Sequence, residues 1–454
     1  MKCVGLIVFC VGGGSKLLQS QLDGVNNISS IPGYPLKYFY KHWDEWKKKH
    51  KTINSNLALK LITKHHASIL DTRMIPGNSG LRNLGKKRNN FIKISKSKFS
   101  LNFIKYLNKK KINTRNVILA IHTAYFLSKK KKQLPKNFLF HIHEAQYFNN
   151  YAVKDFQKMK LLVCCRDPIN YFWKRIRLDK NIEKENFNVT DRILLRQYDY
   201  INSLNSMFQG FNNLKNNFFK NYHFIKFEDL KKNNFQTLKK IGKYLEINIT
   251  KKKINPSFNG LEWWSDAKYD KYHKKTFDGK IYDYSKDFKN FFSFEINILK
   301  YVLNPFFKKV EYNNLTVQKS VLNYFFTILT FLFPTKFGIK TFLYFLNPLN
   351  FLYFTRFNFL ETFGKNKLKN YYFHAMYKHK DQYGDRLFLK YNYLRRFIFK
   401  YDSNKKMKLV IFPFKILLFV LNNIFYFGAY INIFLLYFKR ILILASNLFI
   451  LKAL

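Results

Sequence analysis

Apolar and polar residues follow one another along the first two thirds of the chain in a pattern that predicts short strands separated by helices. The runs at 3–11 (CVGLIVFCV) and 159–165 (MKLLVCC) are short and apolar, which is typical of strands in the centre of a sheet. The stretch 138–144 (FLFHIHE) alternates apolar and polar residues, as a strand with two different faces does. Strands alternating with helices predict an α/β fold with a central parallel sheet.

A glycine turn follows the first predicted strand, at residues 12–14, and Leu18 and Leu22 are spaced for a helix that begins at Ser15. A turn between a strand and a helix presents backbone amides and the positive end of the helix, and both attract an anion. Two other interpretations stay open. A plain strand-to-helix turn also requires glycine. Residues 2–11 could also be a signal peptide, with Lys2 as its charged end followed by an apolar stretch of the usual length.

Each predicted strand ends in chemically unusual residues, which are GGGSK after the first, HIHE at 141–144 and RDP at 166–168. Ligands of open α/β sheets bind beyond the carboxyl ends of the strands, so we expect one ligand site formed by these three segments. The common nucleoside-triphosphate loop has the pattern G-x-x-x-x-G-K-[ST], whereas here the serine precedes the lysine. No carboxylate for magnesium follows a later strand either, which disfavours a kinase or an ATPase.

Length and charge add two expectations. A chain of 454 residues exceeds one ordinary domain and predicts two regions. The net charge of +54, from 81 Lys and Arg against 27 Asp and Glu, is compatible with nucleic acid, an anionic membrane or a polyanionic substrate. Heavy use of Lys, Asn, Ile, Phe and Tyr also follows from an AT-rich coding sequence whatever the function. Because no recognition motif accompanies the charge, we expect no specific nucleic-acid partner.

The cysteines of the chain lie in apolar runs and lack the C-x-x-C spacing of zinc sites and redox motifs. We therefore expect reduced, buried thiols in a cytosolic protein rather than a disulfide framework. The four positions are Cys3, Cys10, Cys164 and Cys165.

Four segments, in this order along residues 1–310, resemble the motifs of sulfotransferases that use 3'-phosphoadenylyl sulfate (PAPS), in particular the bacterial carbohydrate type. VGGGSKLLQSQLDG (11–24) resembles the 5'-phosphosulfate loop, and LLVCCRDPINYFWKRI (161–176) resembles the strand and helix that bind the 3'-phosphate. The segment 224–247 resembles the strand, E-D-L turn and helix of the family, and FNGLEWWSD (258–266) resembles a late segment of bacterial members. The resemblance implies a P-loop-type three-layer fold, PAPS as the sulfate donor and a hydroxyl of a glycan or lipid-linked saccharide as the acceptor.

The resemblance also implies how the donor is held. Arg166 is expected to bind the 3'-phosphate, because a guanidinium is a rigid, permanently charged fork that matches a phosphate. Family members place a serine eight residues later, where this chain has Lys174, which can contact a phosphate as a point charge. Members also carry a cation near the position of Gly12, and Lys16 is the expected substitute that stabilises the leaving phosphate. The loop residues implied to cradle the 5'-phosphosulfate are Gly12, Gly13, Gly14, Ser15, Lys16 and Leu17.

Sulfuryl transfer to a hydroxyl requires a base that takes the hydroxyl proton. In the resemblance this base lies at the end of the strand before Arg166, where His143 and Glu144 stand. Strand alternation puts His141 and His143 on one face, and we expect His143 to be the base, with Glu144 as the second candidate. His122 is an outside candidate that a core position also explains. No metal is expected, because these residues lack a third ligand at a fixed spacing.

Two further segments are expected to have mainly structural roles. FEDL (227–230) ends a strand and begins a helix whose apolar spacing suits packing, and the tryptophans of EWW (262–264) are expected to pack rather than to form a saccharide platform. An alternative function stays open, because the loop cation and the family serine are both missing. This alternative is a catalytically inactive protein with the sulfotransferase fold that acts as a membrane-associated scaffold or binding protein.

The resemblance ends near residue 310, and we expect residues 311–454 to form a helical, aromatic-rich, membrane-associated region. The segment 416–438 has 23 residues without a charge and cationic residues on both sides, enough to cross a bilayer core. The uncharged runs 320–335 and 341–355 are interrupted by proline, which favours interfacial helices. This region predicts a cytoplasmic protein at the inner face of the membrane, and a buried helical core is the alternative.

Overall fold

The chain divides into two compact units, of which one comprises 1–171 and 203–283 and the other 172–202 and 284–454. The expected boundary near residue 310 stays a prediction. The computed structural model describes residues 2–9, 12–25, 27–75, 80–129, 134–144, 150–169, 221–249, 255–265, 281 and 293–317.

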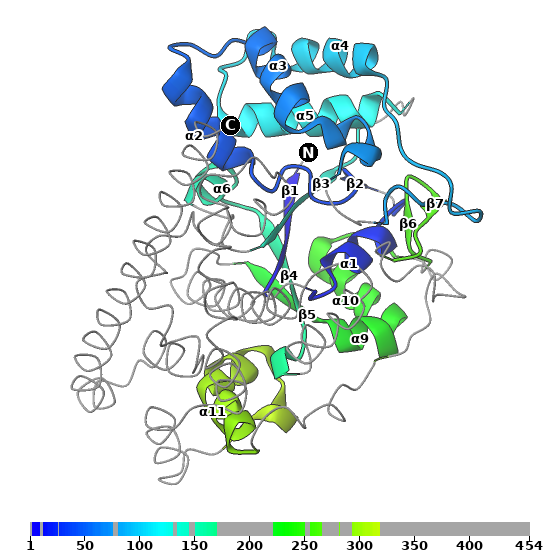
Figure 1. Ribbon diagram of the computed structural model, residues 1–454, viewed down its shortest axis with the longest axis vertical. Coiled ribbons are helices and arrows are strands. Elements are labelled where there is room, and N and C mark those ends of the chain that lie inside the picture. Colours follow the sequence, from blue (N-terminus) through cyan, green and yellow to red (C-terminus); the bar gives the residue numbers. More distant parts are fainter. Residues whose placement is uncertain are drawn as a thin grey trace, which may run out of the picture. The chain divides into compact units, whose positions relative to one another are not determined.

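A five-stranded sheet with the order β2-β3-β1-β4-β5 forms the centre of the first unit (Figure 1). All four neighbouring pairs are parallel. The three strands expected from the sequence are confirmed as β1, β3 and β4, and they are adjacent as β3-β1-β4. Because these strands are parallel, their carboxyl ends share one edge of the sheet. The bounds are β1 Lys2–Val8, β2 Ile28–Ser30, β3 Asn137–Glu144, β4 Lys160–Cys165 and β5 Tyr222–Lys226.

Helices cover both faces of this sheet. Phe138 and Phe140 of β3 contact the His122 ring of α5, with centroids 4.5 and 6.2 Å away, whereas His141 contacts Gln19 of α1. Successive strand residues point to opposite faces, so α5 and α1 lie on opposite sides and the predicted three-layer α/β fold is confirmed. The elements around the sheet are α1 Ser15–Gln21, α2 Phe39–Lys49, α3 Ser55–His65, η1 Ala67–Ile69, η2 Thr72–Met74, α4 Lys96–Leu107, α5 Thr114–Leu127, α6 Asn150–Asp155, α9 Phe227–Lys232, α10 Asn234–Leu245 and the hairpin of β6 Ser257–Phe258 with β7 Leu261–Glu262.

The core of this unit follows the apolar pattern of the sequence. Leu238, Ile241 and Leu245 of α10 are buried, as their spacing predicts, and six of the seven residues of β1 are buried. The described cysteines, Cys3, Cys164 and Cys165, are also buried and form no disulfide within the described ranges. Cys10 lies outside the described residues. The thiols therefore act as small apolar side chains of the core.

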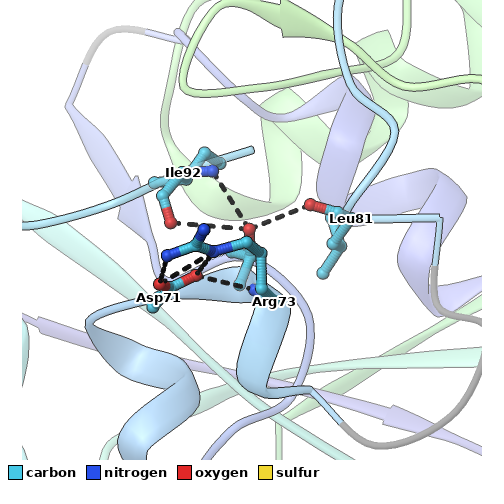
Figure 2. A network of polar contacts seen from close by, with 5 residues as sticks. Asp71, Arg73, Leu81 and Ile92 are labelled. Atoms are coloured by element: carbon cyan, nitrogen blue, oxygen red, sulfur yellow. Dashed lines mark hydrogen bonds and ion pairs between the residues drawn. The ribbon is translucent and has the colours of Figure 1, made fainter. Parts of the chain in front are cut away.

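The connection between α3 and α4 is fixed by one buried hydroxyl. Figure 2 shows the surrounding polar network. Thr72 is 2% exposed, and its Oγ1 donates to the carbonyl of Leu81 (2.9 Å) and accepts from the N–H of Ile92 (3.0 Å). At the exposed side of the same turn, Arg73 donates to Asp71 at 2.6 Å. Thr72 thus links its own turn to the backbone at Leu81 and at Ile92, in a connection without a long helix or strand.

The described part of the second unit consists of α11 Ser293–Val310 and η8 Asn313–Leu315. The apolar face of α11 is buried at Leu303, Phe306 and Phe307. Among the described helices of the chain, none combines the length and the apolar character needed to cross a bilayer. Of the expected membrane-associated region 311–454, residues 318–454, which include the segment 416–438, lie outside the described residues.

Candidate functional site

The turn between β1 and α1 requires glycine at two positions. Gly12 and Gly14 have φ angles of +88° and +91°, in the left-handed region that other residues rarely adopt. Space also requires glycine at the second position, since a Cβ on Gly14 would lie 2.5 Å from Cδ2 of Phe227. The helix α1 then begins at Ser15, as predicted. The first residue of α9 therefore lies directly against the glycine loop.

Arg166 follows β4 and is buried, with 2% of its surface exposed. Its Cζ lies 4.5 Å from the centroid of the Phe227 ring. Nε has no hydrogen-bond partner, and within the described part of the chain no carboxylate forms an ion pair with this guanidinium. A buried cation without a counter-ion is unfavourable, so this arrangement suits an anion bound from solution.

The loop and Arg166, which are about 150 positions apart in the sequence, lie together at one edge of the sheet. The Phe227 ring lies against Gly14 and under the Arg166 guanidinium. The neighbouring strands stay hydrogen-bonded up to this edge, where the N–H of Phe9 donates to the carbonyl of Cys164 (2.8 Å). The structure thus brings together the two groups that the motif resemblance implies bind the two phosphates of one donor; that role stays a prediction.

The corner after Arg166 has the expected helix-start chemistry. Asp167 Oδ1 accepts from the N–H of Ile169 at 2.9 Å, which satisfies a donor that a helix start leaves unpaired. The N–H of Asp167 donates to the carboxylate of Glu228 at 3.1 Å. Glu228 of the E-D-L turn therefore holds the backbone of this corner. Its role is structural, as the sequence predicts.

A β-bulge redirects the end of β3. Leu6 of β1 pairs with His141 and Ile7 pairs with His143, so Ile142 is an extra residue in the ladder. His143 has a φ of +72°, which is uncommon for a residue other than glycine. Bulges often redirect a side chain beside an active site. Here the bulge and the left-handed backbone of His143 allow both histidines to contact one hydroxyl. His141 Nε2 lies 2.9 Å and His143 Nδ1 lies 3.2 Å from Ser15 Oγ.

The two histidines differ in environment. His141 is 4% exposed, and burial, assisted by the nearby charge of Lys16, lowers its pKa to about 3 although a hydrogen bond to the Gly33 carbonyl opposes the shift. His143 is only half-buried and stacks on Tyr34, with centroids 4.2 Å apart and planes at 13°. His141 is therefore neutral at physiological pH, and His143 is the one that solvent or a ligand reaches.

Lys16, the expected substitute for the missing loop cation, lies on the side of the loop where the histidines are. Its Nζ lies 5.4 Å from the centroid of the Tyr34 ring, and Nζ of Lys37 lies 5.9 Å from the same centroid. Gly12 itself is exposed and supplies no charge. The role of Lys16 in catalysis stays a prediction.

The remaining candidate residues have the following places. Gly13 and Leu17 are buried in the turn and the first helical turn, and the hydroxyl of Ser15 is directed to the histidines, so that Ser15 presents only its backbone to a phosphate. Glu144 is the last residue of β3 and pairs with Val8 of β1. Lys174 lies outside the described residues. Cofactor contacts by these residues stay predictions.

His122 lies in the core. Both its ring nitrogens are buried without a hydrogen-bond partner in the described structure, and burial lowers its pKa to about 3. Its contacts with the β3 phenylalanines explain it as a packing residue, and a base for solvent-borne substrates cannot act from there. Within the described ranges there is no cluster of three or more metal-ligating side chains.

Polar contacts hold the described part of the late segment, residues 258–265, to neighbouring parts of the first unit. Asp23, just after α1, accepts from the N–H of Gly260 at 2.8 Å. Trp263 is 7% exposed and packs edge-on against Phe258 at 5.8 Å, and Trp264 donates its indole N–H to a backbone carbonyl at 2.9 Å. The packing interpretation is confirmed for Trp263, whereas Trp264 is half-buried and its role stays a prediction.

Sequence reasoning missed three residues of the site, namely Gln19, Tyr34 and Phe227. Gln19 follows Ser15 by four positions on a helix, so its place on the same face was available from helical periodicity. Phe227 directly precedes the E-D-L turn, but its contact with the loop depends on the pairing of β4 with β5. Tyr34 lies in an irregular connection, and no local pattern places it on His143.

Comparisons with known proteins give matches only among solved structures. No family model matches the chain, and no curated protein sequence matches it significantly. The structure is similar to the sulfotransferase domain from the curacin biosynthetic pathway, with a TM-score of 0.33 and 15% identity, covering 61% of this chain and 88% of that one. It is also similar to sulfotransferase STF9 from Mycobacterium avium, with a TM-score of 0.29 and 9% identity, covering 56% and 66%. Similarity at this level carries no conclusion about function.

Proposed function

We propose that this chain is a sulfotransferase that moves a sulfuryl group from PAPS to an acceptor hydroxyl. The observation that supports this most strongly is Arg166, a buried guanidinium with an unpartnered Nε beside a glycine loop. A nucleotide with phosphates at its 3' and 5' positions supplies one anion for each of these two groups. The order of the sequence motifs agrees with this assignment.

The chemistry and the positions of the loop amides and of Arg166 suit this donor. The backbone amides of residues 12–17 would hold the 5'-phosphosulfate, and Arg166, with Lys174, would hold the 3'-phosphate. When bound, PAPS supplies an activated sulfuryl group with a phosphate as its leaving group. Lys16 would then stabilise the charge that develops on that phosphate. Gly14 is required in this account because only glycine leaves room for the Phe227 ring.

His143 is the proposed general base. It lies half-buried at the carboxyl edge of the sheet, close to the loop, since its Nδ1 is 3.2 Å from Ser15 Oγ. His141 is an unsuitable base because its Nε2 faces the same hydroxyl from a buried position and its pKa is about 3. Glu144 stays the second candidate, as the next residue of β3.

The proposed acceptor is a hydroxyl of a glycan or of a lipid-linked saccharide at the inner, cytoplasmic face of the membrane. The motif resemblance supports a carbohydrate acceptor. The uncharged segment 416–438 and the net charge of +54 support attachment to an anionic membrane. The chain would then meet its acceptor at the lipid surface.

Transfer of labelled sulfate from PAPS to extracted glycans and lipids tests this function. The wild-type chain should label one fraction, and His143→Ala should slow the transfer by about 10²–10⁴-fold while it leaves nucleotide binding unchanged. His50→Ala is a matched control, because His50 ends α2 and belongs to none of the proposed site segments, and should keep full activity. Full activity in His143→Ala would move the base to Glu144 or elsewhere.

One observation favours a second candidate, a non-catalytic relative that binds a nucleotide or glycan at a membrane. The loop has no cation at Gly12, and Lys16 lies over the Tyr34 ring instead. Melting temperatures separate the candidates. An increase with adenosine 3',5'-bisphosphate but not with adenosine 5'-monophosphate, together with no sulfate transfer to any fraction, would favour the non-catalytic relative.

A further inference from the structure

A continuous chain of hydrogen bonds links the buried interior of the first unit to His143. His141 Nδ1 lies 3.0 Å from both the carbonyl of Gly33 and Oε1 of Gln19. His141 Nε2 lies 2.9 Å from Ser15 Oγ, and Ser15 Oγ lies 3.2 Å from His143 Nδ1. Each of these bonds needs one donor and one acceptor, so the direction of one bond determines the direction of the next.

The direction is set at the buried end. A backbone carbonyl only accepts, so the Gly33 carbonyl requires a proton on His141 Nδ1. Gln19 imposes the same requirement, because its other amide atom lies 2.6 Å from the carbonyl of Ile31 and must therefore be the NH₂ group. The atom of Gln19 that faces His141 is thus an oxygen. Burial keeps the His141 ring neutral, so its Nε2 has no proton and accepts.

The direction then passes through Ser15. Because His141 Nε2 accepts, the single proton of the Ser15 hydroxyl must point to it. The Ser15 oxygen can then only accept from His143, whose Nδ1 must carry a proton. In the neutral ring of His143 the other nitrogen, Nε2, is consequently the basic one. The stacking of Tyr34 on the same ring helps to hold its plane.

We propose that His141 is a positioning residue that, through Ser15, fixes the proton of His143 on Nδ1 and so makes Nε2 the nitrogen that acts as the base. The role of His143 as base rests on the proposed function, whereas the place of its proton does not. In the transfer, the acceptor O–H proton moves to Nε2 and the electron pair left on that oxygen forms the new bond to sulfur, as the bond from sulfur to the phosphate oxygen breaks. His143 Nδ1 still donates to Ser15 in the protonated ring, so no hydrogen bond of the chain has to reverse.

Nitrogen NMR of the full chain labelled with ¹⁵N-histidine tests this proposal without donor or acceptor. His143→Gln identifies the signals of His143 by their disappearance. At a pH where the ring is neutral, wild-type His143 should have a protonated Nδ1 and an unprotonated Nε2, with a preference of about tenfold or more, which corresponds to about 1.4 kcal/mol. A proton on Nε2 in the wild-type chain would overturn the proposal, and this measurement depends on no variant.

Ser15→Ala removes the link and should reduce the preference at least about tenfold. Ser20→Ala is its matched control, because Ser20 is a buried serine of the same helix that donates only to its own helix, to the Leu17 carbonyl at 2.7 Å, and should leave the preference unchanged. Equal preferences in the two variants would contradict the proposal.

The role of His141 itself is tested by a pair of substitutions. His141→Gln can keep an acceptor oxygen near Ser15 and should retain the preference of His143, whereas His141→Met has no such oxygen and should lose it. Retention in His141→Met would overturn the positioning role. Titration of the wild-type sample with adenosine 3',5'-bisphosphate separates the two claims, because absence of binding would refute the proposed function and would leave the proton assignment as measured.

Discussion

Gly14→Ala should destabilise the protein more than Gly24→Ala, although both glycines have a positive φ. Two effects act at Gly14. Alanine at a φ of +91° costs about 1–2 kcal/mol, and its Cβ would lie 2.5 Å from Phe227 Cδ2, an overlap that costs a further 1–3 kcal/mol or so. Gly24 has a φ of +68° and nothing within 4 Å of a Cβ, so Gly24→Ala carries only the first cost. We expect losses of about 2–5 kcal/mol at Gly14 and about 1–2 kcal/mol at Gly24.

Urea denaturation of the two variants measures this difference. A second comparison isolates the contact, because Phe227→Leu shortens the opposing side chain and should recover about 1–2 kcal/mol of the loss when combined with Gly14→Ala. Equal losses in Gly14→Ala and Gly24→Ala, with no recovery in the double variant, would show that Phe227 does not lie against the loop. The shared position of the loop and Arg166 would then lose its support.

Two further predictions concern stability. Burial lowers the pKa of His66 to about 4 and of His122 and His141 to about 3, so the unfolded chain binds protons first as the pH falls below about 6.5, and each histidine then costs about 1.4 kcal/mol per pH unit. Urea denaturation should show a steep loss of stability between pH 7 and pH 5, and His122→Leu should reduce its slope by about 1.4 kcal/mol per pH unit. An unchanged slope would contradict the burial of a neutral His122. Thr72→Val removes the hydroxyl that donates to the Leu81 carbonyl and accepts from the buried Ile92 N–H, and should cost about 2–4 kcal/mol. Arg73→Ala, at the exposed ion pair with Asp71, should cost much less. Similar losses in these two variants would refute the role given to Thr72.

The three central strands β1, β3 and β4 and their motif-bearing ends were predictable from the sequence, because they depend on local patterns. Short apolar runs that end in glycine, in histidine or in R-D-P predict strands and their ends. Parallel pairing then predicts that the ends share one edge, and β3-β1-β4 confirms it. The helix at Ser15 and the buried face of α10 follow from helical spacing in the same way.

The finer geometry of the site could not be predicted, because it depends on contacts between distant segments. Alternation in HIHE predicts that His141 and His143 share a face, but not the bulge at Ile142 or the left-handed backbone of His143. The burial of Arg166 over Phe227 depends on β5 lying beside β4, which no local pattern gives. The sequence shows which residues carry chemistry, and the tertiary structure determines the direction in which their protons and charges point.

The central claim is that Arg166 and the glycine loop bind the two ends of one nucleotide. Calorimetry with adenosine 3',5'-bisphosphate and adenosine 5'-monophosphate tests it most directly. Arg73→Ala serves as the control, since Arg73 also stacks on an aromatic ring, at 4.0 Å from Phe91. The wild-type chain and Arg73→Ala should prefer the bisphosphate by about tenfold or more, and Arg166→Ala should bind both nucleotides equally. An undiminished preference in Arg166→Ala would contradict the claim.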